Sequence, residues 1–62
     1  MISSRNIEWA LIQKDGTRNV RERHVDDLGN EYFFDYQADV GTDIQAKLDS
    51  RVIEEVSNGS TP

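Results

Sequence analysis

Two turn signals divide the first two thirds of the chain into three short segments. The dipeptide Asp15-Gly16 follows I-E-W-A-L-I-Q-K and is a strong short-range signal for a β-hairpin. The stretch D-D-L-G-N fits a three-residue connection, with a type I turn over Asp27 and Leu28 and with Gly29 in the left-handed position. The chain is therefore predicted to form an antiparallel meander. Its strands are expected over about residues 7–13, 18–25 and 31–37.

The two predicted turns set the pairing between neighbouring strands. A two-residue first turn pairs Leu11 with Val20, Trp9 with Glu22, and Ile7 with His24. A three-residue second turn pairs His24 with Tyr32, Glu22 with Phe34, and Val20 with Tyr36. The two turns are independent of each other, yet they agree in placing one apolar set on one face: Ile7, Trp9, Leu11, Val20, Tyr32, Phe34 and Tyr36. Trp9 is predicted to be the most buried large side chain.

A helix is predicted after the meander, from about residue 43 to residue 56. Thr42 is a favourable N-cap, and Gln45 three residues later completes a capping box. An apolar stripe repeats every four residues and is widened by Ile53; its members are Ile44, Leu48, Val52 and Val56. The predicted fold class is therefore α+β, a three-stranded antiparallel β-meander followed by one C-terminal α-helix packed on one sheet face.

The length and composition indicate one small domain that depends on a partner. Residues 7–56 are predicted to form a single βββα domain, with an N-terminal arm at 1–6 and a flexible C-terminal tail at 57–62. A chain of 62 residues buries only about 60% of its unfolded surface, and the absence of cysteine removes disulfides as a source of stability. Docking onto other protein subunits, or onto further copies of itself, is therefore expected.

The charge balance argues against two classes of partner. The chain has 12 acidic and 7 basic residues, a net charge of −5, whereas a nucleic-acid-backbone binder needs clustered Lys and Arg. The same charge disfavours an anionic membrane surface, and no stretch approaches the roughly 20 apolar residues of a membrane span. The first residues, M-I-S-S-R-N, lack an apolar signal core, so the expected default location is the cytoplasm of the cell that makes the chain.

Glu22 and His24 are anomalous, because they lie on the face that is predicted to be the core. A buried carboxylate costs several kcal/mol unless it is paired. In a structural interpretation, the two side chains lie at the edge of a small core and are satisfied by each other, by tyrosine hydroxyls or by water. In a functional interpretation, they make a buried polar contact with a partner protein or form an acid–base pair. The structural interpretation is favoured.

Other candidate site residues are few. An enzyme needs a pocket and a third positioned group, and one His with no Cys leaves little to build it. Asp26 and Asp27 beside His24 are better explained by turn chemistry than by metal binding. The chain is therefore predicted to be non-enzymatic, with no catalytic residue, cofactor or metal. Phe33 on the charged face, together with Ile12, is a candidate half of an interface. The candidate protein-interface residues are Ile12, Glu22, His24, Phe33 and Tyr36.

One ordered set of residues over about positions 7 to 43 forms a recognisable pattern. It reads Ile7-x-Trp9, Asp15-Gly16, Arg18-x-Val20-x-Glu22-x-His24-x-Asp26, Gly29, Tyr32 and Tyr36-x-Ala38. This pattern resembles small, mostly uncharacterised proteins encoded among the structural genes of tailed bacteriophages, although Val25 stands where that pattern has Thr. The resemblance implies a virion component, such as an accessory piece of a baseplate, tail tip, neck or capsid, and it brings no catalytic residues.

A second function class remains open. An acidic regulatory or anti-defence protein could occupy the nucleic-acid site of a host protein by charge mimicry, using Asp39, Asp43, Asp49, Glu54 and Glu55. For the structural class, docking is expected through the sheet edges and the terminal arms. Both outer strands of a three-stranded meander leave backbone N–H and C=O groups unpaired, and neither predicted edge strand contains proline.

Overall fold

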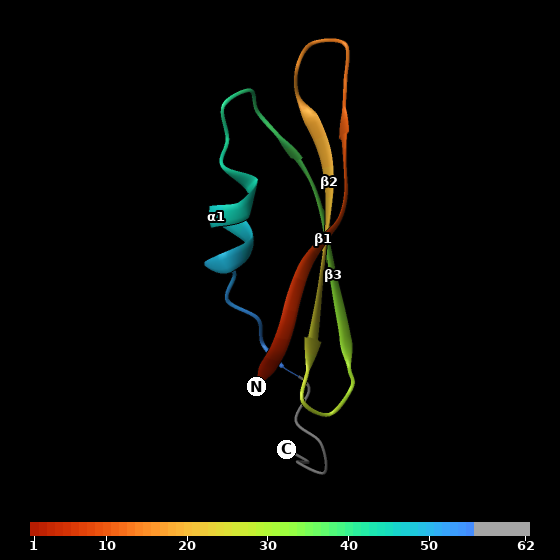
Figure 1. Ribbon diagram of the computed structural model, residues 1–62, viewed down its shortest axis with the longest axis vertical. Coiled ribbons are helices and arrows are strands. Elements are labelled where there is room, and N and C mark those ends of the chain that lie inside the picture. The colour runs from red at the N-terminus through yellow and green to blue at the C-terminus, as the bar shows by residue number, and fades with distance from the viewer. Residues whose placement is uncertain (56–62) are drawn as a thin grey trace.

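The computed structural model describes residues 1–55, and its elements follow the predicted order. Three strands, β1 (Ile2–Ile12), β2 (Arg18–Asp26) and β3 (Glu31–Ala38), form one antiparallel sheet in the order β1-β2-β3. A short helix, α1 (Ile44–Asp49), packs on one face of this sheet (Figure 1). The predicted α+β fold is therefore confirmed. The predicted tail at 57–62 lies outside the described residues. Below, the inner face is the one that α1 covers, and the outer face is the opposite one.

The second hairpin has the predicted turn and register. The Asp26 N–H donates to the Asn30 carbonyl at 3.0 Å, the Gly29 N–H donates to the Asp26 carbonyl at 3.1 Å, and Gly29 has a φ of +88°. These contacts define a type I turn closed by a left-handed glycine. The predicted pairs His24–Tyr32, Glu22–Phe34 and Val20–Tyr36 are all present.

The first hairpin has a different turn from the one predicted. The Gln13 N–H donates to the Thr17 carbonyl at 2.7 Å, and Gly16, at a φ of +90°, donates to the Gln13 carbonyl at 3.0 Å. The loop therefore contains three residues instead of two, and Ala10 lies opposite Val20 in the place predicted for Leu11. A register shift of one residue moves side chains to the other face. Trp9 consequently lies opposite Arg21 on the outer face and is 39% exposed, so its predicted burial is wrong.

A β-bulge at Glu8 adds a second one-residue shift further down β1, so that side chains beyond it return to the faces predicted for them. Ile7 lies opposite Glu22 and Trp9 lies opposite Arg21, so Glu8 is an extra residue in the ladder. Without the bulge, the register of the first turn would place Ile7 on the outer face. With it, Ile7 is half-buried on the inner face and Arg5 lies opposite His24. The bulge therefore allows a three-residue first turn while keeping Ile7 and Arg5 on the inner face.

The first strand begins at Ile2, well before its predicted start near residue 7. Residues that were predicted to form an arm pair with the end of β2, where Ser4 lies opposite Val25. The Ser3 hydroxyl also donates to the Val25 carbonyl at 3.1 Å. The end of β2 is therefore paired with β1 on one side and, as far as Val25, with β3 on the other.

The helix is shorter than predicted and begins one residue later. Asp43 is its N-cap and accepts a hydrogen bond from the Ala46 N–H at 3.0 Å, so the predicted Thr42–Gln45 capping box is wrong. The helix ends at Asp49, which leaves Val52 at 92% exposure instead of on a buried stripe. Within the helix, Leu48 is buried and Ile44 is half-buried, as the stripe predicts. Val56 lies outside the described residues.

Among residues 1–55, as many polar side chains as apolar ones are buried. The buried apolar residues are Val20, Ala38 and Leu48, and the buried polar residues are Glu22, His24 and Asp26. Burial of ionisable groups is costly unless each is paired or hydrogen-bonded. The stability of the fold therefore depends on the hydrogen-bond and ion-pair partners of these three polar side chains.

Candidate functional site

Glu22 and His24 lie together in a closed polar cluster on the inner face. His24 Nε2 lies 2.9 Å from Glu22 Oε1, and neither side chain has exposed surface. The Arg51 guanidinium, which follows α1, closes the cluster with two hydrogen bonds to the Glu22 carboxylate, of 2.8 and 3.0 Å. Such a bidentate pair is among the stronger charge-assisted contacts. The structural interpretation of Glu22 and His24 therefore fits this arrangement, with Arg51 as a partner that the sequence analysis missed.

The electrostatics of this cluster follow from Arg51. Burial alone would raise the pKa of the Glu22 carboxyl, but the hydrogen bonds from Arg51 and His24 outweigh it and lower the pKa below its usual value. Glu22 is therefore ionised at neutral pH. Because an ionised carboxylate only accepts hydrogen bonds, His24 donates through its Nε2–H. His24 Nδ1 is buried and has no hydrogen-bond partner in residues 1–55.

Aromatic rings of β3 complete the cluster. The Phe34 ring meets His24 edge-on, with centroids 5.6 Å apart, and Arg51 Cζ lies 4.7 Å from the Phe34 centroid. Burial and the negative charge of Glu22 raise the pKa of the Tyr36 hydroxyl. That hydroxyl is near Glu22 but makes no hydrogen bond of normal geometry within residues 1–55. The rings help to shield the Glu22 carboxylate from water, which strengthens the ion pair.

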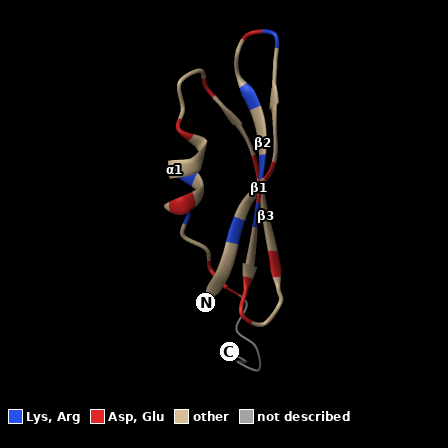
Figure 2. Ribbon diagram, viewed as in Figure 1, with Lys and Arg blue, Asp and Glu red and all other residues tan. Residues whose placement is uncertain are grey.

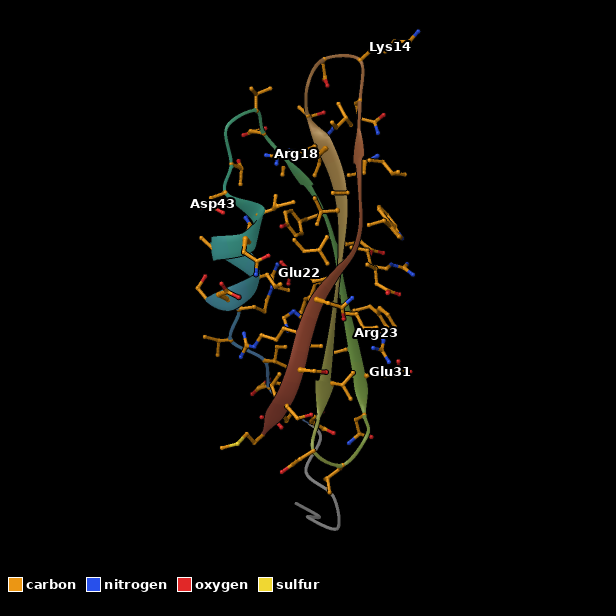
Figure 3. All side chains as sticks on the ribbon, in the orientation of Figure 1. Lys14, Arg18, Glu22, Arg23, Glu31 and Asp43 are labelled. Atoms are coloured by element: carbon orange, nitrogen blue, oxygen red, sulfur yellow. The ribbon has the colours of Figure 1, made fainter. Side chains whose placement is uncertain are left out.

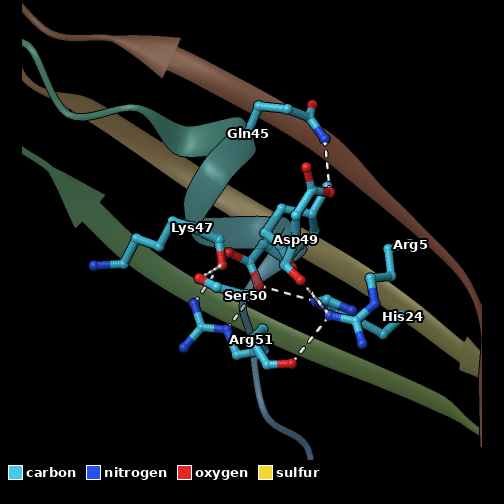
Figure 4. A network of polar contacts seen from close by, with 9 residues as sticks. Arg5, His24, Gln45, Lys47, Asp49, Ser50 and Arg51 are labelled. Atoms are coloured by element: carbon cyan, nitrogen blue, oxygen red, sulfur yellow. Dashed lines mark hydrogen bonds and ion pairs between the residues drawn. The ribbon is translucent and has the colours of Figure 1, made fainter.

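Arg5 holds the end of α1 against the sheet (Figure 4). Its Nη1 donates to three carbonyl oxygens, those of Leu48 at 3.2 Å, Asp49 at 3.3 Å and Arg51 at 3.0 Å. The last carbonyls of a helix have no partner within the helix, and a cation there also complements the helix dipole. Arg5, from the segment predicted to be an arm, therefore stops the helix where Arg51 can reach Glu22.

Asp26 anchors the second turn. Its carboxylate accepts hydrogen bonds from the backbone N–H groups of Leu28 and Asn30, from the Asn30 side chain and from the Tyr32 hydroxyl, at 2.8 to 3.0 Å. Burial opposes ionisation, but these donors outweigh it and lower the pKa of Asp26 to about 2. The turn interpretation of Asp26 therefore accounts for its geometry.

On the outer face, as in the closed cluster, an arginine contacts a carboxylate and aromatic rings, but here these side chains are accessible to solvent. The Arg21 guanidinium lies between two exposed rings, 5.7 Å from the Trp9 centroid and 5.4 Å from the Phe33 centroid. It also donates two hydrogen bonds to the Asp35 carboxylate, of 2.8 and 3.0 Å. Arg23 pairs with Glu31 on the same side of the sheet, whereas Glu22 points toward α1 (Figure 3). We call Trp9, Arg21 and Phe33 the outer stack.

The predicted interface residues do not form one surface. Glu22 and His24 are buried in the closed cluster, and Tyr36 is half-buried beside it. Phe33 is on the outer face at 45% exposure, as predicted. Ile12 is 77% exposed but lies opposite Arg18 on the inner-face side, because the first turn has three residues. The predicted Phe33–Ile12 patch is therefore wrong in its pairing.

Sequence patterns did not identify the contact partners of Phe33 on the outer face or of Glu22 on the inner face. Trp9 and Arg21 belong to the outer stack, which a three-residue reading of the first turn would have found. Arg51 could have been found from the rule that a buried carboxylate needs a cation. Several arginines were available for that role, and the choice among them depends on where α1 ends.

The described residues offer little to hold a small molecule. They enclose no pocket, and they contain no group of three or more side chains that could ligate a metal ion. Their one helix is too short and too polar to span a bilayer. Strands β1 and β2 carry charges of both signs, β3 carries only acidic ones, and acidic residues gather at the second turn (Figure 2).

Comparison with known proteins adds no relative. No protein-family model, no curated protein and no solved structure matches this chain.

Proposed function

We propose that this chain is a small non-enzymatic interaction protein that docks through its outer face onto larger protein subunits. The assembly we propose is a tailed-phage particle, in which the chain is an accessory component of the baseplate, tail, neck or capsid. The single observation behind the docking is the outer stack, in which two exposed aromatic rings enclose an arginine already held by Asp35.

The composition of the outer stack supports a protein partner. Trp, Arg and aromatic residues dominate the energetically important positions of protein interfaces. Leu11, which is 57% exposed, extends the apolar part of this face beside Trp9. Arg21 loses little conformational freedom on docking, because stacking and its two hydrogen bonds to Asp35 already fix it.

The closed cluster supports the non-enzymatic part of the proposal. Catalysis by Glu22 or His24 would require contact with a substrate, and both side chains are fully buried. Their hydrogen bonds with each other and with Arg51 account for their presence under α1. The phage assignment rests on the resemblance of residues 7–43 to proteins from virion gene clusters.

Mass spectrometry of purified particles tests this proposal. Particles from the phage that encodes the chain are sedimented, and the chain is quantified in each fraction against the major tail and capsid proteins. We expect co-sedimentation at a fixed ratio. Early synthesis with absence from particles would overturn the proposal and favour an acidic mimic of nucleic acid.

A variant pair tests the docking face. Phe33→Ser removes a ring from the outer stack, and we expect it to lower incorporation into particles at least tenfold relative to the wild type. Val52→Ser is the matched control, because Val52 is 92% exposed and lies outside the outer face. Equal incorporation of the two variants would exclude the outer face as the docking surface.

A further inference from the structure

The tip of the edge strand β1 carries four consecutive apolar residues that are all exposed. Trp9 is 39% exposed, Leu11 57% and Ile12 77%, and Ala10 is also exposed. We call residues 9–12 the apolar run. Natural edge strands are normally blunted by charge, proline or cover, because an open apolar edge invites pairing with another chain. In Figure 1, this half of β1 lies on the far side of β2 from α1.

The backbone of the apolar run is ready to pair. Gln13 directs its N–H toward β2, where the N–H donates to the Thr17 carbonyl. Backbone groups of successive strand residues point alternately toward opposite neighbours, so Ala10 and Ile12 direct their N–H and C=O groups to the open edge. No other strand of the described chain lies against that edge.

We propose that two copies of this chain pair antiparallel through the open edges of β1, centred on Leu11, to form one six-stranded sheet. This inference does not rest on the proposed function. The pairing is isologous, so each residue contact occurs twice. Ala10 and Ile12 of the second copy then exchange both backbone hydrogen bonds, and the two symmetric pairs give about four such bonds.

The charges on either side of the apolar run favour a second copy of this chain as the partner of this edge. Glu8 and Lys14 flank the apolar run, each three residues from Leu11. Antiparallel pairing centred on Leu11 therefore brings Glu8, at the bulge of one copy, toward Lys14, in the first turn of the other, just beyond each end of the ladder. Opposite charges at facing positions stabilise a pair of strands.

The alternative centres are less favourable. Centring on Ala10 places Glu8 opposite Ile12, and centring on Ile12 places Lys14 opposite Ala10, so each leaves a charge facing an apolar side chain. The other edge strand, β3, is also a poorer choice. Its charged residues, Glu31 and Asp35, are both acidic, and Phe33 is its one large exposed apolar side chain.

A single-cysteine cross-link tests the register. The chain has no cysteine, so Leu11→Cys introduces one thiol at the two-fold axis. Facing residues of a non-hydrogen-bonded antiparallel pair have Cα atoms about 4.5 Å apart, within the range that a disulfide spans. We expect Leu11→Cys to form a disulfide-linked dimer on mild oxidation at least tenfold faster than Phe33→Cys, the exposed outer-face control on β3. Equal rates would overturn the Leu11-centred pairing.

Charge reversal tests the pairing independently. In sedimentation velocity, we expect a reversible dimer of the wild-type chain and a roughly tenfold weaker dimer of Glu8→Lys, because both salt pairs become repulsive. Adding Lys14→Glu to that variant should restore the dimer, and Glu54→Lys, with the same charge change elsewhere, should have no effect. A monomer at every concentration, or a dimer insensitive to Glu8→Lys, would overturn the proposal.

Discussion

The two faces of the sheet use the same residue types with different consequences. On the inner face, Arg51 pairs with Glu22 against the Phe34 ring, and the carboxylate is fully buried. On the outer face, Arg21 pairs with Asp35 against Phe33, and all three remain accessible to solvent. The contact distances are similar, so the difference is the cover provided by α1 and the residues after it. Cover converts a weak surface ion pair into one whose loss leaves a buried charge.

The largest expected effect separates the two faces. Arg51→Ala leaves the Glu22 carboxylate buried without its cation, and we expect a loss of about 3–5 kcal/mol in the free energy of unfolding. A loss of this size is comparable to the whole stability of a domain this small. The matched variant Arg21→Ala breaks an exposed pair and should cost at most about 1 kcal/mol. Thermal and urea denaturation measure both, and equal losses would show that cover does not distinguish the faces.

Arg5→Ala tests whether Arg5 holds α1 and the residues after it on the inner face. The variant removes the donor to the carbonyls of Leu48, Asp49 and Arg51, and we expect a loss of about 1.5–3 kcal/mol, typical of hydrogen bonds to a charged group. Hydrogen exchange should also speed up at the end of α1 while the β2–β3 ladder stays protected. Unchanged exchange in α1 would contradict the role of Arg5 as its anchor. Arg5→Lys, which keeps the charge but not the fork of donors, should recover part of the loss.

The dependence of stability on pH tests the buried carboxylates. The pKa values of Glu22 and Asp26 are lowered in the folded chain, that of Asp26 to about 2. Their contribution is therefore present above the unfolded pKa values, near 4, and is lost as the pH falls through the lowered folded values, which for Asp26 extends to about 2. We expect the unfolding midpoint to decrease steeply over this range. The decrease should be shallower in Asp26→Asn than in Glu54→Gln, which removes the same charge from an exposed position.

The smallest expected effect is on the outer face. Trp9→Ala removes a ring that is 39% exposed, and we expect a loss of about 1 kcal/mol from its stacking on Arg21. A buried tryptophan would cost about 3–5 kcal/mol, the outcome that the two-residue first turn implied. Calorimetry of the variant distinguishes the two values. A loss in the upper range would place Trp9 in the core and contradict the three-residue first turn.

The sequence was sufficient where the controlling interactions are local. The second turn was predicted with its register, because Asp26 and Gly29 act on residues within the same short loop. Asp15-Gly16 correctly predicted a hairpin, but the signal is compatible with two loop lengths. Choosing the shorter one misplaced Trp9 and Leu11, since a shift of one residue exchanges the faces.

For the candidate site, the sequence identified Glu22 and His24 as unusual and Phe33 as exposed, but not their partners. Arg51 contacts Glu22 across 29 positions in the chain, and no local pattern predicts such a contact. The outer stack depends on the three-residue length of the first turn, which places Trp9 opposite Arg21. Strand and turn patterns alone therefore could not predict either the closed cluster around Arg51 or the outer stack around Arg21.

The sequence by itself determined the order of elements, the meander and the register of β2 against β3, because turn chemistry and alternation act over a few residues. Only the tertiary structure decided the bulge at Glu8 and the end of α1 at Asp49. The bulge arises because the first turn and the inner face require different registers in one strand. The helix ends where Arg5, more than forty positions earlier, binds its last carbonyls and frees Arg51 for Glu22. Both outcomes depend on contacts between segments that only folding brings together.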